Sequence, residues 1–458
     1  MTLRPFCLAP FVLACTLAGT AHAGALLDVY TQAEASDKAL LAAGFQRDAN
    51  REARPQAIAA LLPQLNGQGS YSIQDSTTAY SSARFDPAPP VITVNQDTKT
   101  EDTTLSLSLT QAVFDWAAFT KLGQSFSQVA LAETGYQAAR QALILRTAQA
   151  YFNVLTTGET QRAALAQTTA IGRQLEQSKQ RFEVGLSAIT DVQDAQARAD
   201  LALAQQLQAE TAHSAAQRAL AQITGQRNNK VVAVREDLPL VGPEPLSSEG
   251  WIEAARKSNL AVLAAQLVAK VADADVTIAR SRHLPTLGLQ AGYSDASGDY
   301  TSNNNGIKSK SPTSSEGTQI QAIVTVPIFS GGATQSGVRV AKAAYGQRQA
   351  EYDDAIRTAE RNAGDAYQGV LTGISSVKAF KAAVTSTRTA LEASEVGQQV
   401  GTRTAVDVLN AQQQLYAAES NYAKARYDYL LAILQLKQAA GRLDASDLLD
   451  IDRLLVAN

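Results

Sequence analysis

The residues in this chain whose type and spacing suggest chemistry are two aspartates, each six residues after a glycine. Residues 184–192 (VGLSAITDV) reappear as residues 400–408 (VGTRTAVDV), so Asp191 and Asp407 hold the same place in a repeated phrase. Each copy follows one long helical stretch and begins another, and glycine permits the tight turn between them. The repeat therefore predicts two equivalent hairpin tips. A carboxylate in the first turns of a helix either stabilises that helix through its dipole or serves function by attracting cations.

Other arrangements that would support catalysis or cofactor binding do not emerge from the sequence. His213 and His283 stand alone, without the cysteine or carboxylate spacing of a metal site. Residues 329–332 (FSGG) lack the Gly-Lys-Ser/Thr ending of a phosphate loop and fit a bend between a strand and a helix better. We therefore expect no enzyme activity, no cofactor and no metal site.

The first residues have the pattern of a secretory signal. Arg4 supplies the positive charge, residues 11–14 lie in the apolar run, and residues 21–23 (AHA) form a cleavage site, so the mature chain is expected to begin at Gly24. A lipoprotein cleavage site before Cys15 is the alternative. Both cysteines lie in this segment, and we therefore expect no disulfide in the mature protein.

The sequence as a whole is duplicated, and its composition favours helices packed along their length. Aromatic residues make up only 6% of the 458 residues, and a net charge of −3 gives no indication of a nucleic-acid surface. Residues 62–65 (LPQL) match residues 284–287 (LPTL) early in the two units. The predicted organisation is a signal peptide at 1–23, a first repeat at 24–225, an equatorial strap at 226–249, a second repeat at 250–441 and a C-terminal segment at 442–458.

Each repeat contains two runs of alternating residues that predict strands. The longest run has about the 9 to 11 residues of a membrane strand, and the others are a few residues shorter. One face of each run is apolar and the other is small and polar, which suits a membrane strand or a half-exposed soluble sheet. The polar segments 75–103 and 294–318 are expected to be long loops, with disordered insertions as the alternative. The strand runs are 65–74, 105–110, 287–293 and 320–326.

The helices are unusually long because prolines are absent from the stretches that form them. Residues 117–183 and 333–399 are each predicted to form one helix of roughly 100 Å. The shorter helices match this length when they stack end to end, and the pairings that we expect are 186–224 with 250–283 and 404–440 with 28–61. This arrangement predicts a hollow helical cylinder instead of a globular core.

An oligomer follows from the number of strands. Four strands per chain cannot close a barrel, and unpaired strand edges are not tolerated in lipid. Beyond Gly24 no apolar stretch is long enough for a transmembrane helix, so membrane entry would depend on the strands. A trimer with twelve strands and twelve helical columns is the smallest assembly that we expect to enclose a lumen.

Across essentially the whole mature chain, the sequence resembles the TolC-like outer-membrane efflux proteins. This resemblance implies a mainly α trimeric channel, with a 12-stranded β-barrel in the outer membrane of a Gram-negative bacterium continued by an α-helical barrel in the periplasm. It also implies two partners, a periplasmic adaptor and an inner-membrane pump that is either a drug exporter or an ABC transporter for type I secretion. The matching segments are 59–65 (AALLPQL), 151–155 (YFNVL), 181–186 (RFEVGL), 188–193 (AITDVQ), 283–287 (HLPTL), 400–409 (VGTRTAVDVL) and 425–430 (ARYDYL).

The alternative from another class is a periplasmic coiled-coil adaptor or scaffold without a membrane barrel. It explains the helices and the signal peptide but not the four alternating strands. The expected function is therefore an exit duct that passively conducts substrates from the pump across the periplasm and the outer membrane.

The resemblance also implies roles for residues at the tips. Arg403 would link to Thr190 and Asp191 of a neighbouring hairpin, and Asp407 would line the constriction, where three carboxylates would repel each other and favour cations. The best-known relative has Tyr at Gln398, a second pore-lining Asp at Asn410 and Asn at Asp194, so one acidic position has changed repeat. The residues expected to contact the adaptor are Gly185, Leu186, Ser187, Gly401 and Thr402.

Overall fold

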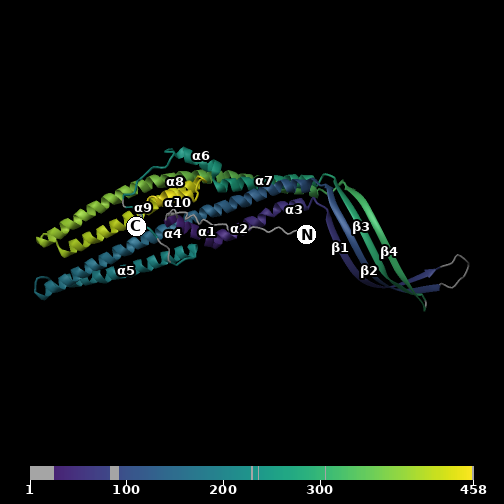
Figure 1. The fold of residues 1–458 in the computed structure, drawn as a ribbon, viewed down its shortest axis with the longest axis horizontal. Coiled ribbons are helices and arrows are strands. Elements are labelled where there is room, and N and C mark those ends of the chain that lie inside the picture. Colours follow the sequence, from purple (N-terminus) through teal and green to yellow (C-terminus); the bar gives the residue numbers. More distant parts are fainter. Residues whose placement is uncertain (1–24, 83–91, 228–230, 236, 305, 456–458) are drawn as a thin grey trace, which may run out of the picture. The chain divides into compact units, whose positions relative to one another are not determined.

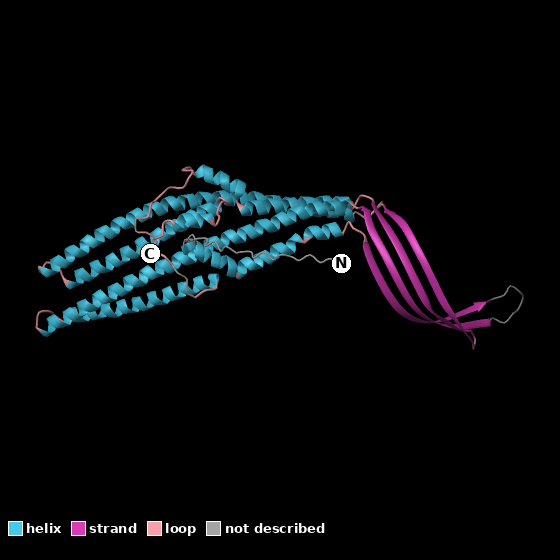
Figure 2. Ribbon diagram, in the orientation of Figure 1, coloured by secondary structure: helices cyan, strands magenta, loops and turns pink. Residues whose placement is uncertain are grey.

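The structure is a computed structural model that describes residues 25–82, 92–227, 231–235, 237–304 and 306–455 (Figure 1). The predicted signal peptide, both cysteines and the proline-rich residues 87–90 lie outside the described residues. Figure 2 shows the elements by type. In chain order they are α1 (Ala25–Ser36), α2 (Lys38–Arg51), α3 (Ala53–Ala59), β1 (Gln64–Ser82), β2 (Ile92–Phe114), α4 (Trp116–Glu183), α5 (Ile189–Thr224), α6 (Ser248–Ser258), α7 (Leu260–Ser281), β3 (Thr286–Asn304), β4 (Ile307–Thr325), α8 (Ala333–Gln399), α9 (Ala405–Ala439) and α10 (Ser446–Asp452).

The two long helices are confirmed, whereas the helices expected before the strands are broken. α4 and α8 run without interruption for 68 and 67 residues. The predicted helix 28–61 is divided into α1, α2 and α3, and 250–283 is divided into α6 and α7. Asp37 and Asn259 stand at equivalent breaks in the two repeats. The carboxylate of Asp37 accepts a hydrogen bond from the Leu40 N–H at 2.7 Å, which caps the start of α2.

The end-to-end pairing of the short helices differs from the one predicted. The Ser36 hydroxyl at the end of α1 donates to the Ile223 carbonyl of α5 at 3.1 Å. The Asn259 amide, between α6 and α7, donates to the Ala439 carbonyl of α9 at 2.9 Å. Thus α5 ends against the α1–α2 break and α9 against the α6–α7 break, within the same repeat in each case. The predicted pairing was wrong because the alternatives have nearly equal lengths, and only contacts distinguish them.

The strands form one antiparallel sheet in the order β1-β2-β3-β4, and each has 19 to 23 residues. The expected loops 75–103 and 294–318 are therefore largely strand, because pairing continues through their Ser- and Thr-rich ends, as in Asp75 opposite Lys99. The β3–β4 connection is short, and the Gly306 N–H donates to the Asn303 side chain at 3.1 Å. Polarity was a poor guide to loops because polar β-branched residues fit an exposed strand.

The register of the sheet brings the apolar residues of all four strands onto one face. Leu65 lies opposite Leu109, Leu109 opposite Ala291, and Ala291 opposite Ile320. Since residues directly opposite each other project to the same side, the alternation predicted from sequence forms one continuous apolar face. This face is uncovered in the single chain, where Ile320 is 80% exposed.

The chain forms two compact units, which both long helices enter. The first comprises Met1–Leu41, Ala139–Asn259 and Ala359–Asn458, and the second comprises Ala42–Ala138 and Leu260–Thr358. The first unit contains both hairpin tips, and its buried side chains include Tyr151, Tyr427 and Leu434. Among the described residues, no helix combines the length and apolar character needed to span a lipid bilayer.

Candidate functional site at the hairpin tips

The two predicted tips have the same backbone turn. In the first, the Gly185 N–H donates to the Phe182 carbonyl at 2.9 Å and the Leu186 N–H donates to the Arg181 carbonyl at 2.7 Å. In the second tip, the Gly401 N–H donates to the Gln398 carbonyl at 3.2 Å and the Thr402 N–H donates to the Gly397 carbonyl at 2.8 Å. This pair of bonds defines a Schellman motif, which needs a left-handed residue. Gly185 and Gly401 supply it with φ of 75° and 77°.

The repeated aspartate begins the helix that leaves the second tip. The Asp407 carboxylate accepts from the Thr404 N–H at 2.9 Å and from the Thr404 hydroxyl at 2.8 Å. The Asp407 N–H donates in return to the Thr404 hydroxyl at 3.2 Å, which completes a capping box. The hydrogen bonds from the Thr404 backbone and side chain, with help from the charge of Arg403, lower the pKa of Asp407 below its usual value. Asp407 is therefore held as an anion in the single chain.

The first tip has only half of this capping arrangement. The Ala188 N–H donates to the Asp191 carboxylate at 3.3 Å. Alanine has no side-chain acceptor, so the Asp191 N–H bonds only the Ala188 carbonyl, at 3.1 Å. The two copies of the phrase thus share a fold but differ in how firmly the returning helix is capped.

Gln398 and Arg403 lie on either side of the Gly401 turn at the second tip. Arg403 packs across Gly397, where an added Cβ would meet its Cγ at 2.6 Å. The Gln398 side-chain nitrogen is buried and has no hydrogen-bond partner among the described residues. The expected link from Arg403 to Thr190 and Asp191 joins two chains, so it stays a prediction in the structure of one chain.

A groove with a volume of about 320 Å³ separates the two tips within the chain. Asp194 lines this groove with Asp191, and the cations along it are Arg181, Arg198 and Arg403. The groove thus mixes charges of both signs, and whether Asp194 also reaches a lumen stays a prediction.

Asn410 lies next to this groove and contacts a residue that the sequence reasoning missed. The Arg198 guanidinium of α5 donates to the Asn410 side-chain oxygen of α9 at 3.0 Å. The available signal was spacing, because Arg198 follows Asp194 by four residues and therefore shares its helix face. Asp194 and Asn410 hold equivalent places in the two repeats. The contact therefore joins Asn410 on α9 to α5, the helix that carries Asp194.

The tips also expose apolar side chains. Val184 and Leu186 at the first tip are 69% and 70% exposed, and Val400 at the second is 69% exposed. Thr402 is exposed as well, and Ser187 is half-buried. Apolar groups at such positions are typical of a surface that contacts a partner.

The strap is held by tyrosines that occupy equivalent places in the two repeats, a second feature missed from the sequence. Tyr151 and Tyr367 each begin the pattern Tyr-x-x-Val-Leu-Thr. The Tyr151 hydroxyl accepts from the Val232 N–H at 2.7 Å and donates to its carbonyl at 3.1 Å, and burial raises the pKa of Tyr151. The Tyr367 hydroxyl donates to the Leu246 carbonyl.

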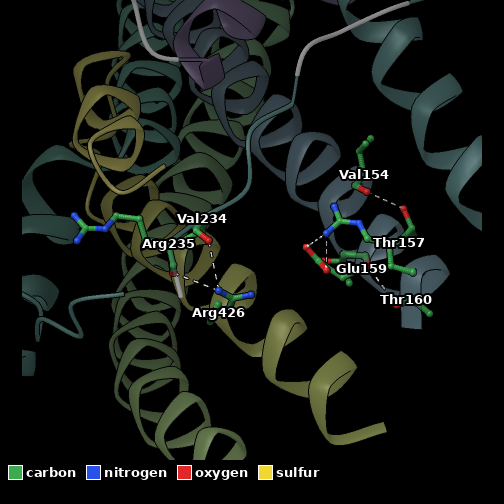
Figure 3. Close-up of polar contacts among 9 residues, drawn as sticks. Val154, Thr157, Glu159, Thr160, Val234, Arg235 and Arg426 are labelled. Atoms are coloured by element: carbon green, nitrogen blue, oxygen red, sulfur yellow. Dashed lines mark hydrogen bonds and ion pairs between the residues drawn. The ribbon is translucent and has the colours of Figure 1, made fainter. Parts of the chain in front are cut away.

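Arg426 of α9 holds the same strap. Its guanidinium donates to the Val234 and Arg235 carbonyls at 3.4 and 3.3 Å (Figure 3). The helices near the strap are therefore joined to it by side chains that bond its backbone.

The described residues contain no group of three or more His, Cys, Asp or Glu side chains arranged to hold a metal ion. What the tips offer chemically is fixed charge, exposed apolar surface and a turn between helices. Such an arrangement suits contact and gating.

Comparisons with known proteins agree over nearly the whole chain. The family model described as "Outer membrane efflux protein" matches residues 29–226 and 251–442, one segment per repeat. The chain is 37% identical to the outer membrane protein TolC of Vibrio cholerae over 95% of each chain. It is 30% identical to the alkaline protease secretion protein AprF of Pseudomonas aeruginosa, over 93% of this chain and 86% of that one. Among solved structures, the Campylobacter jejuni CmeC outer membrane channel aligns with a TM-score of 0.73 at 19% identity, covering 93% of this chain and 89% of that chain.

Proposed function

Because the chain belongs to the outer membrane efflux protein family, we propose that its tips form the gate of an outer-membrane exit duct built from three copies. The duct serves efflux or type I secretion in a Gram-negative bacterium. The family comprises outer-membrane channels and not enzymes. The rival function, a periplasmic scaffold without membrane strands, is disfavoured because the family model matches most of both repeats.

The open sheet is the observation that supports a trimer. β1 and β4 are edge strands, each 19 residues long, and the apolar residues of the sheet share one face. Lipid cannot satisfy the free N–H and C=O groups of such edges, so β4 of one copy must pair with β1 of another. Three copies give a 12-stranded barrel with its apolar face toward outer-membrane lipid, and their helices give a 12-column tunnel.

The duct acts with a periplasmic adaptor and an inner-membrane pump. The exposed apolar residues Val184, Leu186 and Val400 support adaptor contact at the tips, together with the neighbouring Gly185, Ser187, Gly401 and Thr402. AprF is named for the secretion of alkaline protease, which makes an ABC transporter for type I secretion one candidate pump. A drug exporter is the other candidate.

The gate is formed where the tips of three copies meet. Arg403 of one copy bonds Thr190 and Asp191 of the next, and Gln398 supports this contact from the end of α8. Asp407 lines the constriction, with Asn410 and Asp194 near it. The hydrogen bonds from Thr404 lower the pKa of Asp407, so each carboxylate would enter the ring as an anion. Mutual repulsion in the ring then works against that stabilisation and favours bound cations.

Single-channel recordings in planar bilayers test the Asp407 ring. The wild-type channel should be cation-selective and blocked by a trivalent cation added on the tip side. Asp407→Ala should lose most of this block. Asp200→Ala is a matched control, since Asp200 is exposed on α5 and does not line the groove between the tips. Full block in the Asp407→Ala channel would remove Asp407 from the constriction.

A further inference from the structure

The two hairpins of one chain, α4–α5 and α8–α9, touch at several levels between the strap and the tips. Near the strap the contact is between stacked rings, then between hydroxyls, then between small apolar side chains, and last between a guanidinium and an amide. That last contact borders the groove of about 320 Å³, which Arg198 itself lines. In order, the contacts are Phe152 on Tyr427 with ring centres 5.7 Å apart, Thr160 to Ser420 at 3.2 Å, Ile171 and Ala202 with Leu409, and Arg198 to Asn410 at 3.0 Å.

The contact between Arg198 and Asn410 has a distinct position and chemistry. Leu409, the residue before Asn410, is only 4% exposed and packs in the apolar cluster, so the backbone at this point of α9 is fixed. Asn410 itself is exposed, and Arg198 is half-buried. Asp407 lies one helical turn earlier on α9, toward the tip. The bond is therefore placed to set the direction in which the start of α9 leaves the other hairpin.

We propose that Arg198 is a positioning residue that latches the two hairpins of each chain together through Asn410. The latch holds the first turn of α9, and with it Asp407, in the closed arrangement. It acts within one chain, whereas the Arg403 link of the proposed gate acts between chains. This inference rests on the proposed gating function.

The identity of residue 410 sets the strength of the latch. Asparagine offers a neutral oxygen to the guanidinium, and a carboxylate at the same place would accept a stronger, charge-assisted bond. The latch is thus tunable in both directions, since removing the guanidinium weakens it and supplying a carboxylate strengthens it. A residue whose only role is helix stability would not respond in both directions.

Single-channel recording and hydrogen exchange on the intact protein test the latch. Arg198→Ala should raise the ratio of open to closed dwell times by about threefold to fivefold, the effect of losing one partly exposed bond to a charged group. Arg198→Lys should restore part of the wild-type ratio. Asn410→Asp should lower the ratio by about twofold and should have no such effect when combined with Arg198→Ala. Arg181→Ala is the matched control, because Arg181 lines the same groove from α4.

Hydrogen exchange of the first turns of α9 reports the latch independently of conduction. Arg198→Ala and Asn410→Ala should each increase exchange there, and the double variant should exchange no faster than either single variant. Additive effects, or an Asn410→Asp channel whose dwell times match those of the wild type, would overturn the latch. A wild-type protein that forms no channel would instead refute the proposed function, so the two failures are distinguishable.

Discussion

Thr404→Ala should convert the second tip to the weaker capping of the first. The substitution removes two contacts, the Thr404 hydroxyl to the Asp407 carboxylate at 2.8 Å and the Asp407 N–H to that hydroxyl at 3.2 Å. The bond from the Thr404 N–H to Asp407 at 2.9 Å remains. Loss of such a cap costs about 1 kcal/mol. Local opening of the first turn of α9 should therefore become about fivefold more frequent, since RT is about 0.59 kcal/mol.

Hydrogen exchange followed by mass spectrometry measures this opening directly in peptides that cover residues 405–412. Thr404→Ser, which keeps the hydroxyl, should retain the wild-type protection. Ala188→Thr is the reverse substitution at the first tip, because it adds the missing capping hydroxyl. Peptides over residues 189–196 should then exchange more slowly by a similar factor. Equal exchange in wild type and Thr404→Ala, with no gain in Ala188→Thr, would show that the capping box does not control the tips.

Two further predictions concern the strap and the chain ends. Tyr151→Phe removes the group that bonds both the N–H and the carbonyl of Val232, so limited proteolysis should cut within residues 231–246 faster than in wild type; an unchanged rate would argue against this anchor. The Asp452 carboxylate accepts from the Leu26 and Leu27 N–H groups at 2.8 and 3.0 Å, and burial raises its pKa. Its contribution to stability is therefore fully present below the unfolded pKa of about 3.9 and declines as pH rises through the folded pKa. Asp452→Asn keeps an oxygen acceptor but does not titrate. The Tm of this variant relative to that of wild type should therefore rise from pH 4 to pH 7, and a Tm difference that does not change with pH would contradict this.

The elements that the sequence predicted best are those fixed by local rules. The unbroken α4 and α8 follow from the absence of proline. The tips follow from Gly185 and Gly401, because the left-handed residue of such a turn is usually glycine. The alternating residues of the strands also gave the correct apolar face. These features depend on the chain's own backbone and on its neighbours in sequence.

What could not be predicted depends on which segments meet. The prediction assigned the partners of α5 and α9 the wrong way round, because helix length does not distinguish them. The side-chain bonds from Ser36 to α5 and from Asn259 to α9 do distinguish them. The strands extend far beyond their apolar parts because pairing, and not hydrophobicity, continues them. Arg198 was missed because its partner Asn410 lies 212 residues away.

In the proposed duct the tips of three chains close the pore, and the closed-state conductance of Arg403→Ala tests this gate more directly than any other measurement. Arg173→Ala is the control, because Arg173 is exposed on α4 and does not line the groove between the tips. In planar bilayers the Arg403→Ala channel should conduct more in its closed state than wild type, while Arg173→Ala should match wild type. A closed-state conductance unchanged by Arg403→Ala would contradict a gate held at the tips.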